Sequence, residues 1–270
     1  MLVDSHCHLD FPDFAEGLAD TVVRARSAGV GHMLTICTLV RKFPQVLAVA
    51  ERFAEVTCSV GTHPHSAGEE RDVTVREIVE LTKHPRVVAI GEAGLDYFYQ
   101  KSSREDQEAV FRRHIAAAQE TGLPLVIHAR DADEDTARIL REEMAKSPFK
   151  ALLHCYTGGR ALAETGIELG LYVSFSGILT FPKSNALREL AAALPVERLL
   201  VETDAPFLAP HPHRGKRNEP AFVRHTARVL AEVKGLSEAK IAEITTANFF
   251  TLFAKAKAAA DTAANVSGAA

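Results

Sequence analysis

Residues 86–92 read RVVAIGE, residues 104–120 read REDQEAVFRRHIAAAQE and residues 123–128 read LPLVIH, and this stretch decides the fold. The first and last runs are short and largely apolar, as strands are, whereas the middle run mixes apolar and charged residues at helical spacing. A strand, a helix and a second strand in this order predict two parallel strands joined by a helix.

The same alternation continues on both sides of this stretch. Six further apolar runs of strand length bring the total to eight, at residues 2–7, 30–37, 55–61, 150–155, 171–175 and 198–202. Eight such units favour a closed barrel over an open sheet, and such barrels occupy about 250 residues as one domain. We therefore expect an α/β protein whose single domain, a (β/α)₈ TIM barrel, spans residues 1–256. An Ala-rich tail at residues 257–270 is expected to be frayed or disordered.

Charge and hydropathy restrict the class of protein. The chain has 270 residues, with 31 Lys and Arg against 35 Asp and Glu, and a formal net charge of −4. The field of the whole molecule would repel a nucleic acid, which would need local cationic groups. The start, MLVDSHCHLD, lacks the basic beginning and apolar core of a signal peptide, and no apolar run approaches the about 18 residues of a membrane span. We expect a cytoplasmic protein without membrane contacts, and a monomer.

The cysteines and the chain length make a structural cross-link unnecessary. Cys7, Cys37, Cys58 and Cys155 show no CxxC spacing and lie in apolar runs, so we expect free thiols. A chain of this size buries roughly 75% of its unfolded surface, so its core needs no metal. Any bound metal is then expected to be functional.

Potential metal ligands stand where the expected strands end. They are His6 and His8 at the end of the first strand, His63 and His65 after the third, Glu92 at the end of the fourth, and His128, His154 and Asp204 at the ends of the fifth, sixth and eighth. Active sites of this fold lie at the C-terminal ends of the strands, so these side chains are expected to converge on one pocket.

Strand alternation separates inward from outward side chains. In His6, Cys7 and His8 the two imidazoles point the same way and the thiol points the other. The same rule turns Cys155 away from the pocket if His154 points inward, and it puts Glu202 on the inward side with Asp204.

Closure of the barrel predicts two groups of ligands. It makes the eighth strand a neighbour of the first, which brings Asp204 beside His6 and His8, while His128 and His154 lie on adjacent strands. Glu92 adjoins the second group, and its carboxylate can bridge two metals. Two divalent metals about 3.5–4 Å apart would suit hydrolysis in which one activates water and the other stabilises the leaving oxygen.

A single histidine at a barrel end is more often a packing or hydrogen-bonding residue than a ligand. Four inward histidines with two or three carboxylates, however, would be a costly desolvated cluster without a cation. The set as a whole therefore favours a metal site.

The loop HPHRGKRNEP (residues 211–220) supplies local positive charge through Arg214, Lys216 and Arg217. It suits an anionic substrate, but a solvated basic loop explains it equally well. Arg130 is a second candidate phosphate contact, and Asn218 a weaker candidate for substrate binding.

Seven blocks of the chain resemble, in order, the signature blocks of the TatD-related DNases. They are DSHCHLD (4–10), GTHPH (61–65), GEAGLDY (91–97), LVIHAR (125–130), HCYTGG (154–159), ETDAPFLAP (202–210) and RGKRNEP (214–220). An HxH alone occurs throughout the metallo-hydrolases of this fold, whereas seven ordered blocks are specific. Family members commonly read HCFSG where this chain has Tyr156 and Thr157, and Tyr156 is expected to add a hydroxyl at the mouth.

The resemblance implies a metal-dependent DNase that hydrolyses phosphodiester bonds, a 3′–5′ exonuclease on single-stranded DNA. It implies one metal on His6, His8, Glu92 and Asp204 and a second on Glu92, His128 and His154, the division that closure suggested. His63 matches a position near the substrate phosphate or an additional metal. We expect Asp204 to orient or deprotonate the attacking water, with Glu92 as the bridging catalytic carboxylate and Arg214 at the phosphate.

Two other functions fit the same ligands. The first is a metallo-hydrolase of a small ester, amide or lactone, although such relatives often bridge their metals with a carboxylated lysine where this chain has Glu92. The second is a non-catalytic, metal-stabilised binding protein. Ligand type leaves the metal as Mg²⁺, Mn²⁺ or Zn²⁺.

Overall fold

A computed structural model of the protein describes residues 1–257. Its eight strands are β1 (Leu2–Cys7), β2 (Val30–Thr35), β3 (Val56–Val60), β4 (Val87–Asp96), β5 (Leu125–Arg130), β6 (Ala151–Leu153), β7 (Tyr172–Phe175) and β8 (Leu199–Val201). Its α-helices are α1 (Leu18–Ser27), α2 (Phe43–Arg52), α3 (Val75–Leu81), α4 (Arg104–Thr121), α5 (Asp133–Lys146), α6 (Arg160–Glu168), α7 (Asn185–Ala193), α8 (Val223–Lys234) and α9 (Glu238–Leu252).

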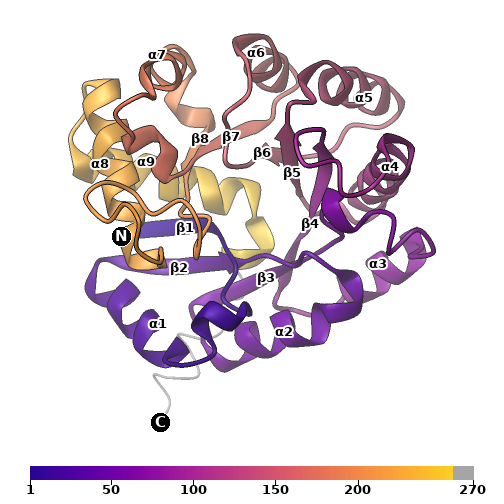
Figure 1. Ribbon diagram of the computed structural model, residues 1–270, viewed down its shortest axis with the longest axis horizontal. Coiled ribbons are helices and arrows are strands. Elements are labelled where there is room, and N and C mark those ends of the chain that lie inside the picture. The colour runs from indigo at the N-terminus through magenta and orange to yellow at the C-terminus, as the bar shows by residue number, and fades with distance from the viewer. Residues whose placement is uncertain (258–270) are drawn as a thin grey trace.

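The strands form one parallel sheet in the order β1 to β8, and the helices surround it (Figure 1). Backbone hydrogen bonds close the sheet between β1 and the segment after β8: the N–H of Asp204 donates to the carbonyl of His6 (2.9 Å), and that of His8 to Ala205 (2.8 Å). The predicted (β/α)₈ barrel is confirmed. All but Lys257 of the tail expected at residues 257–270 lies outside the described residues.

Helix α4 shows how local sequence sets the bounds of an element. The Oγ of Ser103 accepts a hydrogen bond from the N–H of Asp106, which satisfies a free donor of the first turn. Gly122 ends the helix with a φ of 69°, a left-handed conformation that glycine adopts without strain. The helix therefore closely matches the run predicted at residues 104–120.

Strand β4 is longer than expected. It continues four residues beyond Glu92 to Asp96 because β5 also continues, and Gly94 and Asp96 pair with His128 and Arg130. Glu92 therefore lies inside its strand, not at the end where the sequence put it.

Helix α9 covers the N-terminal end of the barrel. Phe249, Leu252 and Phe253 pack against inward-facing strand residues such as Val3 and Val88. The interior of that end is thereby filled with apolar side chains, and the polar residues gather at the other end.

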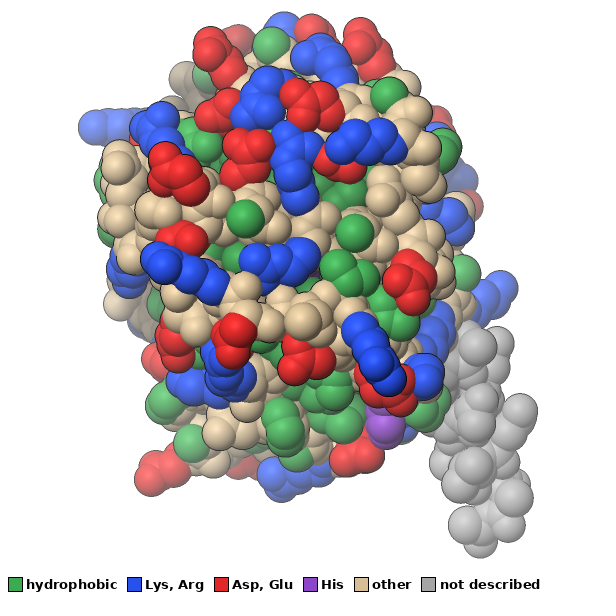
Figure 2. All heavy atoms as spheres, turned by 90° about the vertical axis from the view of Figure 1, so that its right-hand side faces the viewer, with side chains coloured by type: hydrophobic (Ala, Val, Ile, Leu, Met, Phe, Trp, Pro, Cys, Tyr) green, Lys and Arg blue, Asp and Glu red, His purple; other side chains and the backbone are tan. Residues whose placement is uncertain are grey.

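The outer face over α3, α4 and α5 carries charges of both signs, as Figure 2 shows. There Arg138 donates to Glu108 (3.1 Å) and Asp135 (2.9 Å), and Arg112 donates to Glu142 (2.5 Å). These charges compensate one another, so this face offers no basic track to a polyanion.

Within residues 1–257 no helix combines the length and the hydropathy that a membrane crossing requires. All four cysteines are free thiols, as expected. Cys7 is buried with its Sγ 3.5 Å from the carbonyl of Leu34, which agrees with the outward orientation predicted from alternation.

Candidate active site

A cavity of about 1440 Å³ opens at the C-terminal ends of the strands. His8, Glu92, His128, His154 and Asp204 lie in its wall, and the segments that follow β4, β5, β6 and β8 extend it outward. The predicted convergence of these side chains is therefore found in the fold.

The first group of side chains comes from the seam of the barrel. The Nε2 atoms of His6 and His8 are 3.3 Å apart, and Oδ1 of Asp204 lies 3.6 Å from the first and 3.4 Å from the second. Ligand atoms of a tetrahedral ion with bonds of about 2.0–2.1 Å are separated by about 3.3 Å. The spacing therefore suits a shared cation.

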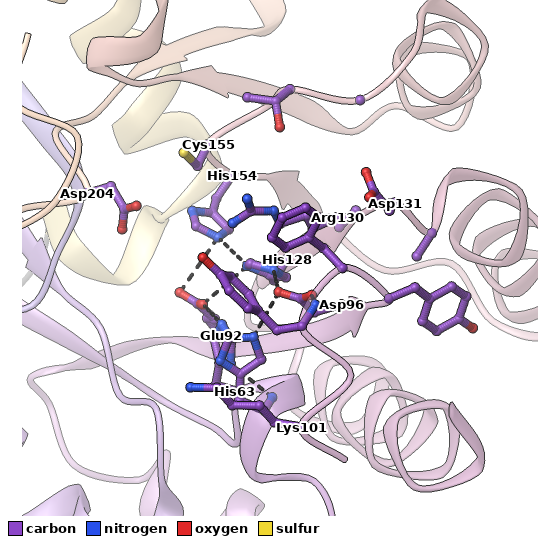
Figure 3. Close-up of a pocket in the computed structure, with 18 of the residues that line it drawn as sticks. His63, Glu92, Asp96, Lys101, His128, Arg130, Asp131, His154, Cys155 and Asp204 are labelled. Atoms are coloured by element: carbon purple, nitrogen blue, oxygen red, sulfur yellow. Dashed lines mark hydrogen bonds and ion pairs between the residues drawn. The ribbon is translucent and has the colours of Figure 1, made fainter. Parts of the chain in front are cut away.

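The second group comes from β5 and the segment after β6. Nδ1 of His128 is 3.3 Å from Nε2 of His154. Glu92 lies between the two groups: its Oε2 is 2.8 Å from Nε2 of His6 and 3.7 Å from Nε2 of His154, and its Oε1 is 3.5 Å from Nδ1 of His128. Figure 3 shows this central position of Glu92, between His63 and His154.

Other side chains fix the orientation of these imidazoles. Nδ1 of His154 contacts Oε1 of Glu202 (3.2 Å), and Nε2 of His128 contacts Oδ2 of Asp96 (3.1 Å). Each contact occupies one ring nitrogen and leaves the other facing the cluster, as partners of metal-bound histidines do. The sequence left Glu202 without a role and missed Asp96. The signal was available, since Asp96 stands four residues after Glu92 on the same face of one strand.

His63 faces the cluster as a hydrogen-bond donor. Its Nδ1 accepts a hydrogen bond from the backbone N–H of His65 (3.0 Å), so the neutral ring carries its proton on Nε2. That nitrogen lies 2.8 Å from Oε1 of Glu92. This geometry favours contact with an anionic oxygen over ligation of a metal.

The site is built to hold positive charge. Burial alone would raise the pKa of Glu92, but His154, His63 and His6 hold that pKa well below its usual value. Burial lowers the pKa of a histidine, yet the hydrogen bond to Asp204 and the charge of Glu92 raise the pKa of His8 to about 9. Burial lowers the pKa of His6 and His154, so these rings stay neutral beside the ionised Glu92 and can present a lone pair to a metal cation.

An unpartnered atom supports the same conclusion. Oε2 of Glu92 is buried and forms no hydrogen bond, although Nε2 of His6 is within 2.8 Å. A buried carboxylate oxygen without a partner is expensive, and a cation between these atoms would satisfy both. The residues present therefore fit a divalent metal.

The other residues singled out from the sequence differ in their distance from the cavity. Arg130 is in the cavity wall, with its Cζ 4.1 Å from the centre of the Phe98 ring. Arg214 is not in that wall, and its guanidinium stacks on Phe181 (3.6 Å). Asn218 is buried and donates to the carbonyls of Thr203 (2.9 Å) and Phe207 (2.6 Å), so it holds the loop and does not face the pocket.

One orientation expected near His154 is wrong. Cys155 contributes to the cavity wall, because β6 ends at Leu153 and the backbone at Cys155 turns with a φ of 42°, but its thiol donates to the buried hydroxyl of Ser176 (3.2 Å). Tyr156 is buried and donates its hydroxyl to the carbonyl of Gly159, so it presents no hydroxyl at the mouth.

The sequence reasoning also missed the aromatic side chains of the cavity wall. Phe98, Tyr99 and Phe207 are exposed there. The run of three aromatic residues 97–99 directly after β4 was the available signal.

A parallel eight-stranded barrel with buried histidines and carboxylates at the C-terminal ends of its strands defines a class, the metal-dependent barrel hydrolases. The sequence profile of the TatD related DNases matches residues 3–254 of this chain. The chain belongs to this family.

Similar sequences and a similar crystal structure support this family membership. The chain is 39% identical over 253 residues to YabD of Bacillus subtilis, described as an uncharacterized metal-dependent hydrolase, covering 94% of this chain and 99% of the relative. It is 35% identical over 257 residues to the 3′-5′ ssDNA/RNA exonuclease TatD of Escherichia fergusonii, covering 93% and 98%. The crystal structure of YJJV, a TatD homolog from Escherichia coli, superimposes with a TM-score of 0.87 at 31% identity, covering 93% and 97%. The protein is a metal-dependent hydrolase of the TatD family.

Proposed function

We propose that the protein is a nuclease that hydrolyses phosphodiester bonds of single-stranded DNA as a 3′–5′ exonuclease with two divalent metals. The observation that carries the proposal is the place of Glu92 between the two groups of ligand atoms: its Oε2 faces His6 and His154, and its Oε1 faces His128. The activity in the name of the Escherichia fergusonii relative supports the choice of substrate.

In this proposal His6, His8, Glu92 and Asp204 hold one metal, and Glu92, His128 and His154 hold the other. Imidazole ligands favour Zn²⁺ or Mn²⁺ over Mg²⁺, which prefers oxygen. The bound pair would supply a Lewis acid for the phosphate and would lower the pKa of the attacking water.

The residues of the chain then have distinct tasks. Asp204 holds the attacking water and accepts its proton, because its carboxylate faces the cavity. Burial would raise the pKa of Asp204, but contacts with His8 and His6 keep that pKa below its usual value, so the group is ionised and ready to accept. His63 donates a hydrogen bond from its Nε2–H to a phosphate oxygen, and Arg130 approaches the same anion from the wall.

The size of the cavity favours an oligonucleotide over a small ester, amide or lactone. Pockets for drug-sized molecules measure about 300–1000 Å³. The cavity of about 1440 Å³ exceeds that range. Competition between a small phosphoester and DNA for the enzyme would distinguish the two functions.

The decisive test uses a single-stranded oligonucleotide labelled at its 5′ or its 3′ end, in DNA and RNA forms. With Mn²⁺ or Mg²⁺ the 5′-labelled strand should shorten stepwise, and EDTA should abolish this. Asp204→Asn should lower kcat on the order of 10²- to 10⁴-fold by removing the proton acceptor. Asp131→Asn changes another carboxylate of the same wall, outside the ligand groups, and should retain activity. No metal-dependent cleavage, or an active Asp204→Asn, would refute the proposal.

A further inference from the structure

Exposed aromatic side chains gather at the cavity. Among the described residues, six large hydrophobic side chains are exposed, and three of them lie in the cavity wall: Phe98 (55% exposed), Tyr99 (52%) and Phe207 (52%). Exposed apolar surface concentrated around a hollow is a mark of ligand binding.

These aromatic side chains lie on opposite sides of the mouth. Phe98 and Tyr99 follow β4 and Phe207 follows β8, and these strands stand opposite one another in a barrel of eight strands. Phe207 meets the edge of Phe11 (6.1 Å between ring centres), and Phe11 in turn stacks on His8 (4.6 Å). The candidate metal ligands therefore lie between two aromatic surfaces.

The side after β4 combines aromatic faces with positive charge. Every Lys and Arg of the cavity wall lies over a ring of this segment. The Cζ of Arg104 is 3.9 Å from the centre of the Tyr97 ring, and that of Arg130 is 4.1 Å from the centre of Phe98 and 4.8 Å from that of Tyr99. The Nζ of Lys101 is 5.8 Å from the centre of the Tyr99 ring. Figure 3 shows Lys101 and Arg130 on this side of Glu92.

Nearby carboxylates of the wall are partly engaged elsewhere. Asp135 accepts a hydrogen bond from the hydroxyl of Tyr97 (2.9 Å), and Asp133 accepts one from the N–H of Gly159 (2.6 Å). Asp131 and Glu134 also line the wall. Because acidic groups accompany the cations, phosphate attraction alone would hold a strand poorly here, and flat contacts with the bases carry the binding.

We infer that the two aromatic surfaces bind the two nucleobases that flank the scissile phosphodiester. Phe98 and Tyr99, backed by Arg130, stack on one base, and Phe207 with Phe11 stacks on the other. Stacking of this kind tolerates any sequence but needs unpaired bases, so these residues select single strands. The inference rests on the proposed nuclease function and adds the residues that recognise the substrate.

The experiment measures binding and cleavage of short oligonucleotides that carry either a normal base or an abasic site next to the scissile bond. The variants are Phe98→Ala with Tyr99→Ala, Phe207→Ala, and the conservative Phe98→Trp and Tyr99→Phe. Leu236→Ala removes an exposed hydrophobic side chain outside the cavity and is the matched control. Because the chain has no Trp, Phe98→Trp also gives a single fluorophore that a stacked base should quench.

The Ala variants should bind the normal strand roughly 5- to 100-fold more weakly, as loss of one base contact predicts. KM should rise more than kcat falls, and the conservative variants should bind like the wild type. The wild type and the matching Ala variant should bind the abasic strand with equal affinity. That strand lacks the base, so removing its aromatic partner costs no further contact.

If the Ala variants lost equal affinity for normal and abasic strands, the substitutions would act by disturbing the fold and not through a base contact. This result would overturn the inference. Unchanged binding of the normal strand by the Ala variants would do the same. If the wild type binds oligonucleotides and the variants bind them weakly, yet no strand is cleaved, the proposed hydrolysis fails while the base-stacking surfaces stand. If the wild type binds no oligonucleotide, both proposals fail.

Discussion

Asp96 holds two histidines with one carboxylate oxygen. Its Oδ2 contacts Nε2 of His128 (3.1 Å) and Nε2 of His65 (2.8 Å), and its Oδ1 accepts the N–H of Tyr99 (2.9 Å). The segment that carries the aromatic residues and a candidate ligand are thus oriented by the same side chain. Burial would raise the pKa of Asp96, but these partners hold that pKa well below its usual value.

Replacing Asp96 by Asn should weaken metal binding without removing a ligand. His128 would lose the partner that directs its Nδ1 toward Glu92, and such losses lower metal affinity about 10- to 100-fold. Titration of the metal-free protein with Mn²⁺ or Zn²⁺ measures the change. Asp135→Asn, which alters a carboxylate bonded to Tyr97 outside the ligand groups, should bind metal like the wild type. An unchanged affinity in Asp96→Asn would show that Asp96 has no such role.

At the scale of elements, the loop after β8 depends on one buried amide. Asn218 donates to the carbonyls of Thr203 and Phe207 and accepts the N–H of Glu219 (2.9 Å). These bonds fix the segment that carries Asp204 and Phe207.

Asn218→Ala should lower the free energy of unfolding by about 1–3 kcal/mol, because it leaves buried carbonyls unsatisfied. It should also reduce activity, since Asp204 would be less well held. Urea denaturation monitored by circular dichroism measures the change in the free energy of unfolding. Lys216→Ala, an exposed change in the same loop, is the control and should unfold like the wild type. Full activity and stability in Asn218→Ala would contradict this role of Asn218.

A second link between elements is sensitive to pH. His114 of α4 accepts the N–H of Thr62 on Nε2 (3.0 Å) and has Nδ1 2.8 Å from the carbonyl of Val110, and burial lowers its pKa to about 4. In the unfolded chain the pKa is near 6.5, so the unfolded state binds a proton more readily. This contribution to stability is complete above pH 6.5 and is lost as the pH falls toward 4.

We expect this histidine to contribute up to about 3 kcal/mol to the pH dependence of unfolding. His114→Gln keeps an acceptor but cannot titrate, so its stability should fall less between pH 7 and pH 4.5 than that of the wild type. His32→Gln removes another buried histidine, whose pKa is lowered by burial to about 4. This variant should independently reduce the slope of the free energy of unfolding against pH. Identical slopes in wild type and both variants would contradict this account.

Prediction from the sequence succeeded for elements and was weaker at their ends. Apolar runs located all eight strands, because a buried parallel strand is apolar throughout. The end of β4 was misjudged, because the apolar run of the sequence stops before Glu92 whereas the strand continues through Gly94 to Asp96. The unrecognised role of Asp96 and the unnoticed aromatic segment after it both follow from that error. The place of Asn218 depended on a loop path that no periodicity encodes.

At the scale of the whole molecule, the buried site opposes folding unless its charges are balanced. Histidines and carboxylates from six strands or their ends lie within hydrogen-bonding distance of one another, largely out of water. A ligand that binds only the folded state stabilises it in proportion to the logarithm of its concentration.

Removal of metal should therefore lower the thermal stability of the protein. At a concentration of about 100 times Kd, Mn²⁺ or Zn²⁺ would add about 2.7 kcal/mol, which raises Tm by roughly 5–10 °C for a chain of this size. Differential scanning calorimetry of chelated and reloaded protein tests this. A variant with His8→Ala and His154→Ala should show a much smaller shift on addition of metal. A Tm of the wild type that is indifferent to metal would argue against the proposed site.

The seam between β1 and the segment after β8 has a consequence for biosynthesis. Asp4 accepts the N–H (2.8 Å) and the hydroxyl (2.6 Å) of Thr203, which lies 199 residues later in the chain. His6 and His8 leave the ribosome first, and their partner Asp204 follows only after seven further strands have been synthesised. A chain that ends before β8 therefore holds five of the six proposed ligands, and its catalytic centre forms only with the last barrel unit. Completion of translation would thus be the step that switches on hydrolysis.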